Sequence, residues 1–109
     1  MNLVILRGTL SSDPVERFLD SGSRLVQLQV STPTDAGVAS VPVAWFDPPV
    51  GGGLTTGDEI VVVGSVIRRF FRSASGTQSR TEVQARTVVR ARNRRSVERA
   101  LAVLDTLDR

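Results

Sequence analysis

Polar and hydrophobic residues alternate along residues 24–32 of the chain. Val26, Leu28 and Val30 are separated by Gln27, Gln29 and Ser31. A period of two puts residues of one kind on one face of a strand, so this pattern predicts a half-buried strand. Related patterns predict four more strands over residues 3–10, 38–46, 60–71 and 80–90, separated by the turn segments SSDP, PTDAG and RSASGTQS and by a longer connection.

The strand predicted over residues 60–71 is hydrophobic on both faces where it begins. One face carries Ile60, Val62, Gly64 and Val66, and the other carries Val61, Val63, Ser65 and Ile67. Such a strand needs cover on both faces. One cover is the core of the domain, and the other is either a helix or a second subunit. We favour a subunit and therefore place Val61 and Val63 in an oligomer interface.

The last predicted strand alternates between small or hydrophobic residues and polar residues. Thr81, Val83, Ala85, Thr87 and Val89 are expected to face inward, and Arg80, Glu82, Gln84, Arg86 and Arg90 outward. Pro42 interrupts the third strand, and because proline cannot donate to a sheet we expect an edge or a bulge there. The DPPVGGG segment, residues 47–53, is expected to be a non-helical connection.

The end of the chain, residues 96–109, has the pattern of an amphipathic helix. Val97, Leu101 and Leu104 fall on one stripe, and Ser96 is a candidate N-cap. A helix of this length is marginal alone, so we expect it to dock on the barrel, across subunits or on a third protein.

Five short strands and one terminal helix predict an all-β fold. The best candidate is a five-stranded OB-fold, a Greek-key barrel, over residues 1–92, with the C-terminal amphipathic helix in residues 93–109. An immunoglobulin-like sandwich would need about seven strands. An SH3-like barrel is a further alternative but is usually shorter.

Positive charge is concentrated in one third of the chain. All 14 basic residues are arginine. Residues 1–64 hold three arginines against seven acids, residues 65–95 hold nine against Glu82 alone, and residues 96–109 hold two against three, so the net charges are −4, +8 and −1. A clustered cationic surface is the usual electrostatic footprint of a protein that binds a polyanion.

The composition excludes several kinds of chemistry. The chain has no cysteine and no histidine, which excludes disulfides, thiolate or imidazole metal sites, and Cys–His or Ser–His catalysis. Glu16, Asp58, Glu59 and Glu82 form no recognisable catalytic pair, so we expect neither an enzyme nor a cofactor. No hydrophobic run is long enough for a signal peptide or a membrane helix. We therefore expect a cytoplasmic protein.

Several motifs together resemble the bacterial single-stranded-DNA-binding proteins. The opening N-x-V-I-L-x-G-x-L-x-x-D-P-x-x-R runs from Asn2 to Arg17, and Gly22 falls where that family has a hairpin glycine. VPVAWF, LTTGDEIVVVG and RTEV follow in the same order, so the resemblance covers residues 1 to about 91. It implies an OB-fold, sequence-independent binding of single-stranded DNA, no catalysis and usually a homotetramer.

The chain also departs from the pattern of that family. DPPVGGG replaces a short helix, Leu3 stands where the family often has a base, and aromatic residues are few. The long tail with an acidic tip, which recruits other enzymes in that family, has no counterpart. We therefore expect a short paralogue that lacks the recruiting function.

Binding of single strands needs aromatic faces for the bases and cations along the backbone. Phe71 lies opposite the core face of its strand and falls where the family has a base-stacking tryptophan, so we expect it to stack; the alternative is a tip residue that covers the rim of the barrel. Trp45 either stacks or packs in the core, Phe70 and Phe18 are expected in the core, and Phe46 is unassigned. The expected phosphate contacts are Arg68, Arg69, Arg72, Arg80, Arg86 and Arg90. RARNRR, residues 90–95, either extends this path or is a solvated run of charge.

The sequence thus predicts a nucleoid-associated protein that binds single-stranded DNA without reading its sequence, in replication, recombination, repair or DNA uptake. We expect a homo-oligomer, with a tetramer favoured over a dimer. RNA is an alternative ligand, because stacking and phosphate contacts serve both. The alternative function is an OB-fold protein-interaction module that has lost DNA binding.

Overall fold

The computed structural model describes residues 1–49 and 53–107. The strands are β1 (Val4–Leu10), β2 (Val15–Phe18), β3 (Arg24–Thr34), β4 (Gly37–Phe46), β5 (Glu59–Ser73) and β6 (Gly76–Arg90). They are followed by the helix α1 (Arg94–Leu101) and a short 3₁₀ helix (Ala102–Thr106). No helix in the described ranges is long and hydrophobic enough to cross a membrane.

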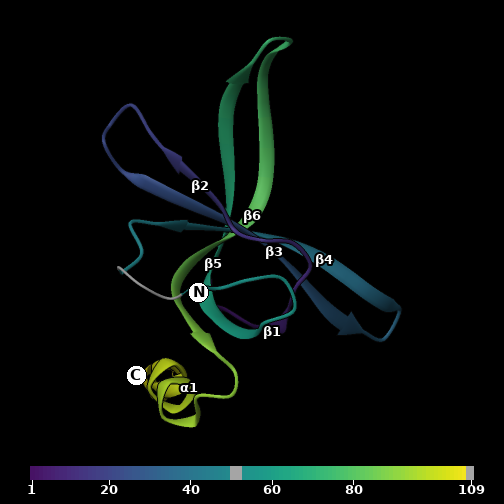
Figure 1. Cartoon of the computed structure of the whole chain (residues 1–109), viewed down its shortest axis with the longest axis vertical. Coiled ribbons are helices and arrows are strands. Elements are labelled where there is room, and N and C mark those ends of the chain that lie inside the picture. Colours follow the sequence, from purple (N-terminus) through teal and green to yellow (C-terminus); the bar gives the residue numbers. More distant parts are fainter. Residues whose placement is uncertain (50–52, 108–109) are drawn as a thin grey trace.

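The strands close into a barrel in the order β1-β5-β6-β4-β3, and β3 returns to β1 (Figure 1). The closing contact joins Thr9 to Ser31 and Leu10 to Val30, both antiparallel. One neighbouring pair, β4 and β6, is parallel, at Val43–Val83 and Ala44–Gln84. The arrangement matches an OB-fold barrel, which confirms the predicted fold class.

Strand β2 was not expected from the sequence. It pairs antiparallel with β3, from Val15 opposite Gln27 to Phe18 opposite Arg24. All four of its side chains are exposed, so hydrophobic periodicity could not reveal it. The side chain of Phe18 is 74% exposed, and its expected place in the core is therefore wrong.

The core lies inside the barrel and is made of aliphatic side chains. Its fully buried members are Leu10, Leu28, Val30, Val43, Ile60 and Val62. Burying each such side chain contributes about 1.5–3 kcal/mol relative to leaving it exposed. The alternation predicted for β3 is confirmed, because Val26, Leu28 and Val30 all belong to this cluster or pack against it.

A bulge in β6 corrects the faces predicted for its second half. Val63 lies opposite Thr87 and Gly64 lies opposite Ala85, so Arg86 is left without a partner in the register. Beyond the bulge Val88, rather than Thr87 or Val89, packs against the core. Gly64 permits this close approach, because a Cβ there would collide with the carbonyl oxygen of Gln84.

The other face of β5 is already buried within one chain, and helix α1 contacts β5. Val61 and Val63 are only 4% and 2% exposed within one chain. Helix α1 contacts β5 and β6, and its residues Val97, Ala100 and Leu101 are half-buried. Val61 and Val63 are therefore buried without a second subunit. Their hydrophobic character no longer supports the predicted oligomer interface.

The start of the helix also differs from expectation. Asn93, rather than Ser96, is the N-cap, and its Oδ1 accepts a hydrogen bond from the Ser96 backbone N–H at 3.1 Å. Pro42 lies opposite Gln29 and just before the short pairing of β4 with β6, so it occupies an edge-like position as expected. Of the connection expected over residues 47–53, residues 50–52 lie outside the described residues, and the rest is not helical.

Candidate nucleic-acid interface

Strands β5 and β6 continue beyond the barrel as a two-stranded hairpin. Strand β5 pairs with β1 only as far as Gly64, opposite Val4. The register of β5 with β6 continues from there to the turn at Ser73 and Gly76. Figure 1 shows this hairpin standing out from the barrel. We call residues 66–82 the projecting hairpin.

Asn2 fixes the base of the projecting hairpin. Its Oδ1 accepts a hydrogen bond from the Val66 N–H at 2.9 Å, and its Nδ2 donates to the Val66 carbonyl at 2.7 Å. The side chain thereby completes the pairing of β5 with the N-terminal segment just before β1.

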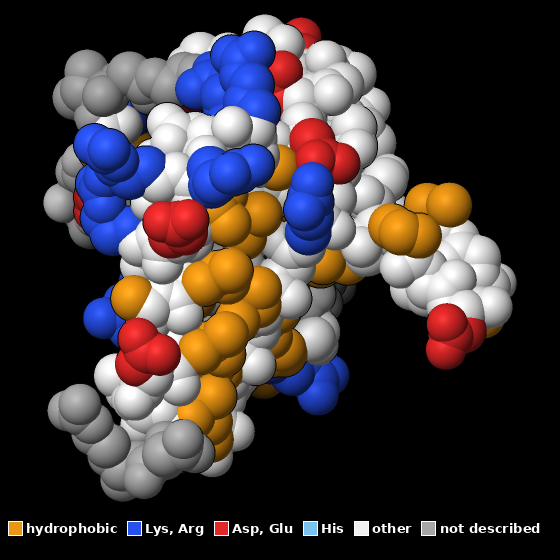
Figure 2. Space-filling model, turned by 90° about the horizontal axis from the view of Figure 1, so that it is seen from below, with side chains coloured by type: hydrophobic (Ala, Val, Ile, Leu, Met, Phe, Trp, Pro, Cys, Tyr) orange, Lys and Arg blue, Asp and Glu red, His pale blue; other side chains and the backbone are white. Residues whose placement is uncertain are grey.

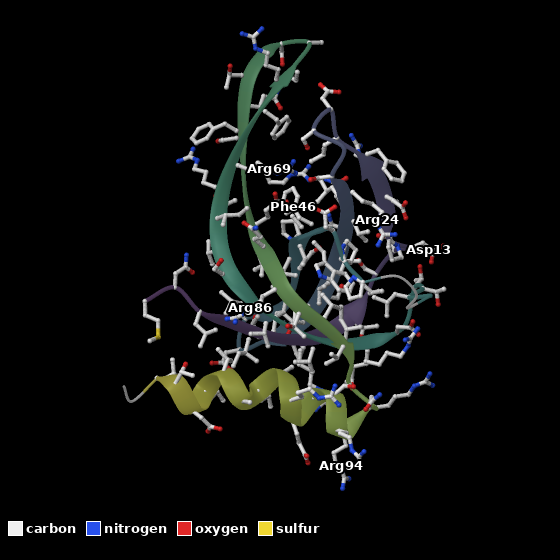
Figure 3. All side chains as sticks on the ribbon, turned by 90° about the vertical axis from the view of Figure 1, so that its left-hand side faces the viewer. Asp13, Arg24, Phe46, Arg69, Arg86 and Arg94 are labelled. Atoms are coloured by element: carbon white, nitrogen blue, oxygen red, sulfur yellow. The ribbon has the colours of Figure 1, made fainter. Side chains whose placement is uncertain are left out.

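The two faces of the hairpin differ in exposure. From Val66 to Phe71 the side chains alternate between exposed and half-buried. The inner face carries the half-buried Ile67, Arg69 and Phe71 of β5 and, opposite them on β6, the buried Glu82 and the exposed Arg80 and Gln78. The exposed side is the outer face, made of Val66, Arg68, Phe70, Arg72, Thr77, Ser79 and Thr81. In Figure 3, Arg69 lies between the hairpin and strands β2 and β3, which places the inner face toward the body of the protein.

A buried ion pair organises the inner face. The Nε of Arg69 donates to Oε1 of Glu82 at 2.6 Å, and the two side chains are 25% and 1% exposed. The guanidinium carbon of Arg69 also lies 5.9 Å from the centroid of the Phe71 ring. Arg80 lies directly opposite Arg69 in the register. The inner face therefore presents an aromatic ring beside two guanidinium groups, with one carboxylate fixing the first of them.

The outer face repeats the pairing of an arginine with a phenylalanine. The guanidinium carbon of Arg68 lies 5.7 Å from the centroid of the Phe70 ring. The Nε and Nη2 of Arg68 donate to the Ser79 Oγ at 3.2 and 3.1 Å. Phe70 is 66% exposed, so its expected place in the core is wrong. Val66 is 45% exposed for the same reason, because the hairpin has left the barrel at this point.

The structure divides the expected binding residues among four places. Arg69, Phe71 and Arg80 share the inner face, and Arg68 and Arg72 lie on the outer face. Arg86 lies at the bulge, and Figure 3 shows it well below Arg69 near β1. Arg90 lies opposite Ile60, at the end of β6 away from the hairpin. These positions lie on different faces and toward opposite ends of β6.

Trp45 does not belong to the hairpin surface. It packs against the core cluster, and it lines a cleft of about 550 Å³ between the barrel and the start of α1, together with Arg24, Leu54, Val88 and Arg90. Of the two roles considered for Trp45, the structure therefore favours core packing.

Two residues of the inner region were given no site role from the sequence. Phe46 follows Trp45 on the opposite side of β4, and Figure 3 shows it below Arg69 in the space between the hairpin and β3. The alternation of Val41, Val43 and Trp45 toward the core could have identified it. Glu82 was expected to face solvent, but it is 3% exposed and anchors Arg69.

A carboxylate joins two turns at the edge of the cleft. The Oδ1 of Asp13 accepts hydrogen bonds from the Thr56 backbone N–H at 2.9 Å and from the Thr56 hydroxyl at 2.8 Å. These two bonds, the backbone one first, lower the pKa of Asp13 below its ordinary value. The group is structural, since it holds the turn after β1 against the turn before β5.

Among the described residues, no group of three or more carboxylates, or other ligating side chains, is placed to hold a metal ion. Neither a scan of protein-family models nor a search of curated proteins finds a match to this chain. The functional argument therefore depends on the site itself.

Proposed function

We propose that this chain binds single-stranded nucleic acid, and DNA in the first instance, without reading its sequence. The observation that carries the proposal is the inner face of the projecting hairpin, where Phe71 lies beside Arg69 and opposite Arg80. A ring for stacking and cations for the backbone are the two components that sequence-tolerant binding of single strands requires.

The position of this face on the barrel supports the same function. OB-folds bind oligonucleotides on the second and third strands of the barrel and on the loop between the fourth and fifth. In this chain those elements are β3, β4 and the projecting hairpin. The inner face and Phe46 both lie in that region (Figure 3).

The ion pair with Glu82 holds the Arg69 side chain in place and still leaves it able to bind a phosphate. It occupies the Nε of Arg69, whereas a guanidinium group carries five N–H donors. Arg69 can therefore keep its contact with Glu82 and still donate to a phosphate. Arg72 and Arg80 have no hydrogen-bond or ion-pair partner within the part of the chain that the structure describes, and they supply further charge.

Self-association is part of the proposal, but on a surface other than Val61 and Val63. Figure 2 shows a stripe of hydrophobic side chains along the C-terminal helical segment. Leu104 and Leu107 on this segment and Ile5 on β1 are exposed. A homo-oligomer would bury such side chains, and a cytoplasmic, nucleoid-associated role in replication, recombination, repair or DNA uptake would follow from binding single-stranded DNA.

The test is fluorescence anisotropy of labelled oligo-dT, titrated beside the matched duplex, with Phe71→Ala and a control variant. Loss of one stacking ring should weaken binding by about 1–3 kcal/mol. Val15→Ala is the control, because Val15 is an exposed hydrophobic residue on β2, outside β3, β4 and the projecting hairpin. Preference for the single strand, weakened by Phe71→Ala alone, is expected. Absence of binding at low salt would contradict the proposal.

A second candidate is a protein-interaction module, and the exposure of Phe18 and Phe70 is the observation that favours it. Exposed aromatic side chains are enriched at protein interfaces as well as at stacking sites. Absence of oligonucleotide binding would leave this function as the better explanation.

A further inference from the structure

We infer that the outer face of the projecting hairpin is a second site for single-stranded nucleic acid, so that one chain holds two separate strand segments. This inference rests on the proposed function of the inner face and adds a second site with its own residues.

The geometry of the hairpin separates the two sites. Phe70 and Phe71 are neighbours in β5, and successive side chains of a strand point to opposite faces. Each ring has its own arginine, Arg68 at 5.7 Å and Arg69 at 5.9 Å. A base stacked on one ring is thus on the other side of the sheet from a base stacked on its neighbour. A short strand segment can use one ring or the other, but not both.

The charge of the outer face fits a polyanion. Its cations are Arg68 and Arg72, and its remaining members are hydroxyl or hydrophobic residues. The only acidic residue of the hairpin, Glu82, belongs to the inner face, where it is paired with Arg69. The outer face thus carries two cations and no carboxylate. This charge suits the phosphate backbone of a nucleic acid better than a protein surface that has both acidic and basic residues.

The exposure and hydrogen bonding of the outer-face side chains also fit a ligand whose bases can stack. Phe70 is 66% exposed, so its ring is open to stacking without rearrangement of the barrel. Arg68 is held over that ring by its two hydrogen bonds to the Ser79 Oγ, which leaves the other guanidinium N–H groups for phosphate oxygens. Arg72 lies further toward the tip of the hairpin, opposite Thr77. The outer face thus offers a ring, an arginine fixed over it and a second arginine along the strand.

The experiment counts oligonucleotides bound per chain. The protein is mixed with excess oligo-dT of about four nucleotides, the short end of the range that one OB-fold covers, to limit contact of one molecule with both faces. Native mass spectrometry then gives the number bound per protomer, whatever the oligomeric state. Thymine tracts do not pair with each other, so a second oligonucleotide requires a second protein site.

We expect two oligonucleotides per chain for the unaltered protein and for Val15→Ala. The double variant Arg68→Ala, Phe70→Ala should bind one, with the affinity of the remaining site unchanged. Phe71→Ala should also leave one well-occupied site, and the affinity of the weakened site should fall by about five- to 150-fold, the equivalent of one lost stacking contact. Because these side chains are on a surface hairpin, circular dichroism should be the same for all variants.

The outcomes separate this inference from the proposed function. One oligonucleotide per chain, lost with Phe71→Ala and kept with the outer-face variant, would overturn the second site and leave the proposed function standing. No bound oligonucleotide would overturn both. A change of oligomeric mass in the outer-face variant, without loss of an oligonucleotide, would assign the face to contact between copies of the chain and overturn the inference.

Discussion

The carboxylate of Glu82 and the guanidinium of Arg69 meet at 2.6 Å at the base of the projecting hairpin, where Glu82 is almost completely buried. This contact lies on the same face as Phe71 and fixes the arginine that covers the ring. The pair thus connects the stability of the hairpin to the arrangement of the candidate interface.

The first prediction concerns the strength of that pair. A double-mutant cycle with Arg69→Ala and Glu82→Ala, measured by urea unfolding, should give a coupling energy of about 1–3 kcal/mol, because the partners interact where water is largely excluded. The exposed pair Arg7–Glu59, at a similar distance of 2.8 Å, is the matched control and should give at most about 1 kcal/mol. Equal couplings for the two pairs would show that burial of Glu82 adds nothing.

The second prediction concerns salt. If Arg80 contacts a phosphate, Arg80→Ala should reduce the slope of log affinity against log salt for oligo-dT by about 0.7, the value for one phosphate of a single strand. Arg99→Ala, an equal loss of charge on an exposed position of α1, is the control and should leave the slope unchanged. A reduced slope in both variants would mean that only net charge matters.

The third prediction concerns Trp45, the only tryptophan in the chain. Because Trp45 packs against the core and lines the cleft beside α1, oligo-dT should leave its fluorescence nearly unchanged. Trp45→Phe should therefore bind oligo-dT as tightly as the unaltered protein. Strong quenching on binding, with loss of affinity in Trp45→Phe, would move the interface to the cleft.

The fourth prediction concerns pH. The pKa of Asp13 is lowered by its hydrogen bonds to Thr56, so the folded state favours the carboxylate. The stability it contributes is present above the ordinary aspartate pKa of about 3.9 and is lost as the pH falls through the lowered pKa. Asp13→Ala should lower the Tm at neutral pH, and the difference from the unaltered protein should shrink on acidification below about pH 4. A difference that does not change with pH would assign the effect to packing alone.

The fifth prediction concerns the helix. Truncation after Arg95 removes most of α1 together with Leu104 and Leu107, the exposed side chains proposed for self-association, so it should lower both the Tm and the apparent mass in sizing experiments. An unchanged or higher apparent mass would show that this segment does not join subunits.

Much of the barrel could be predicted from the sequence, because alternation in β3 and the buried runs of β5 reflect burial directly. The alternation of side chains along β5 also placed Phe71 on the face opposite to Ile60 and Val62. Parity alone does not show where a barrel ends, however, and so Val66 and Phe70 were expected in a core that the hairpin has already left. The bulge at Arg86 was also missed, because it arises from the pairing of β6 with β5. It changes the faces on which Thr87 and Val89 lie.

The candidate site was harder to predict than the fold. The arginines of residues 65–95 marked the right third of the chain, but their division between two faces depends on the register of β5 with β6. The burial of Glu82 depends on what lies over it in space, which its neighbours in the sequence do not specify. Exposed elements such as β2, with Phe18 at its end, leave no hydrophobic periodicity to detect.

The two hydrogen bonds between Asn2 and Val66 have a practical consequence for experiments on this protein. They place the N-terminus of the chain at the root of the hairpin, so an affinity tag fused there would be one residue away from the hairpin's attachment to the barrel. Such a tag could tilt the hairpin or shield its faces, and affinities measured with it would not describe the native surface. A fluorophore at the same position, by contrast, would report movement of the hairpin when a strand binds.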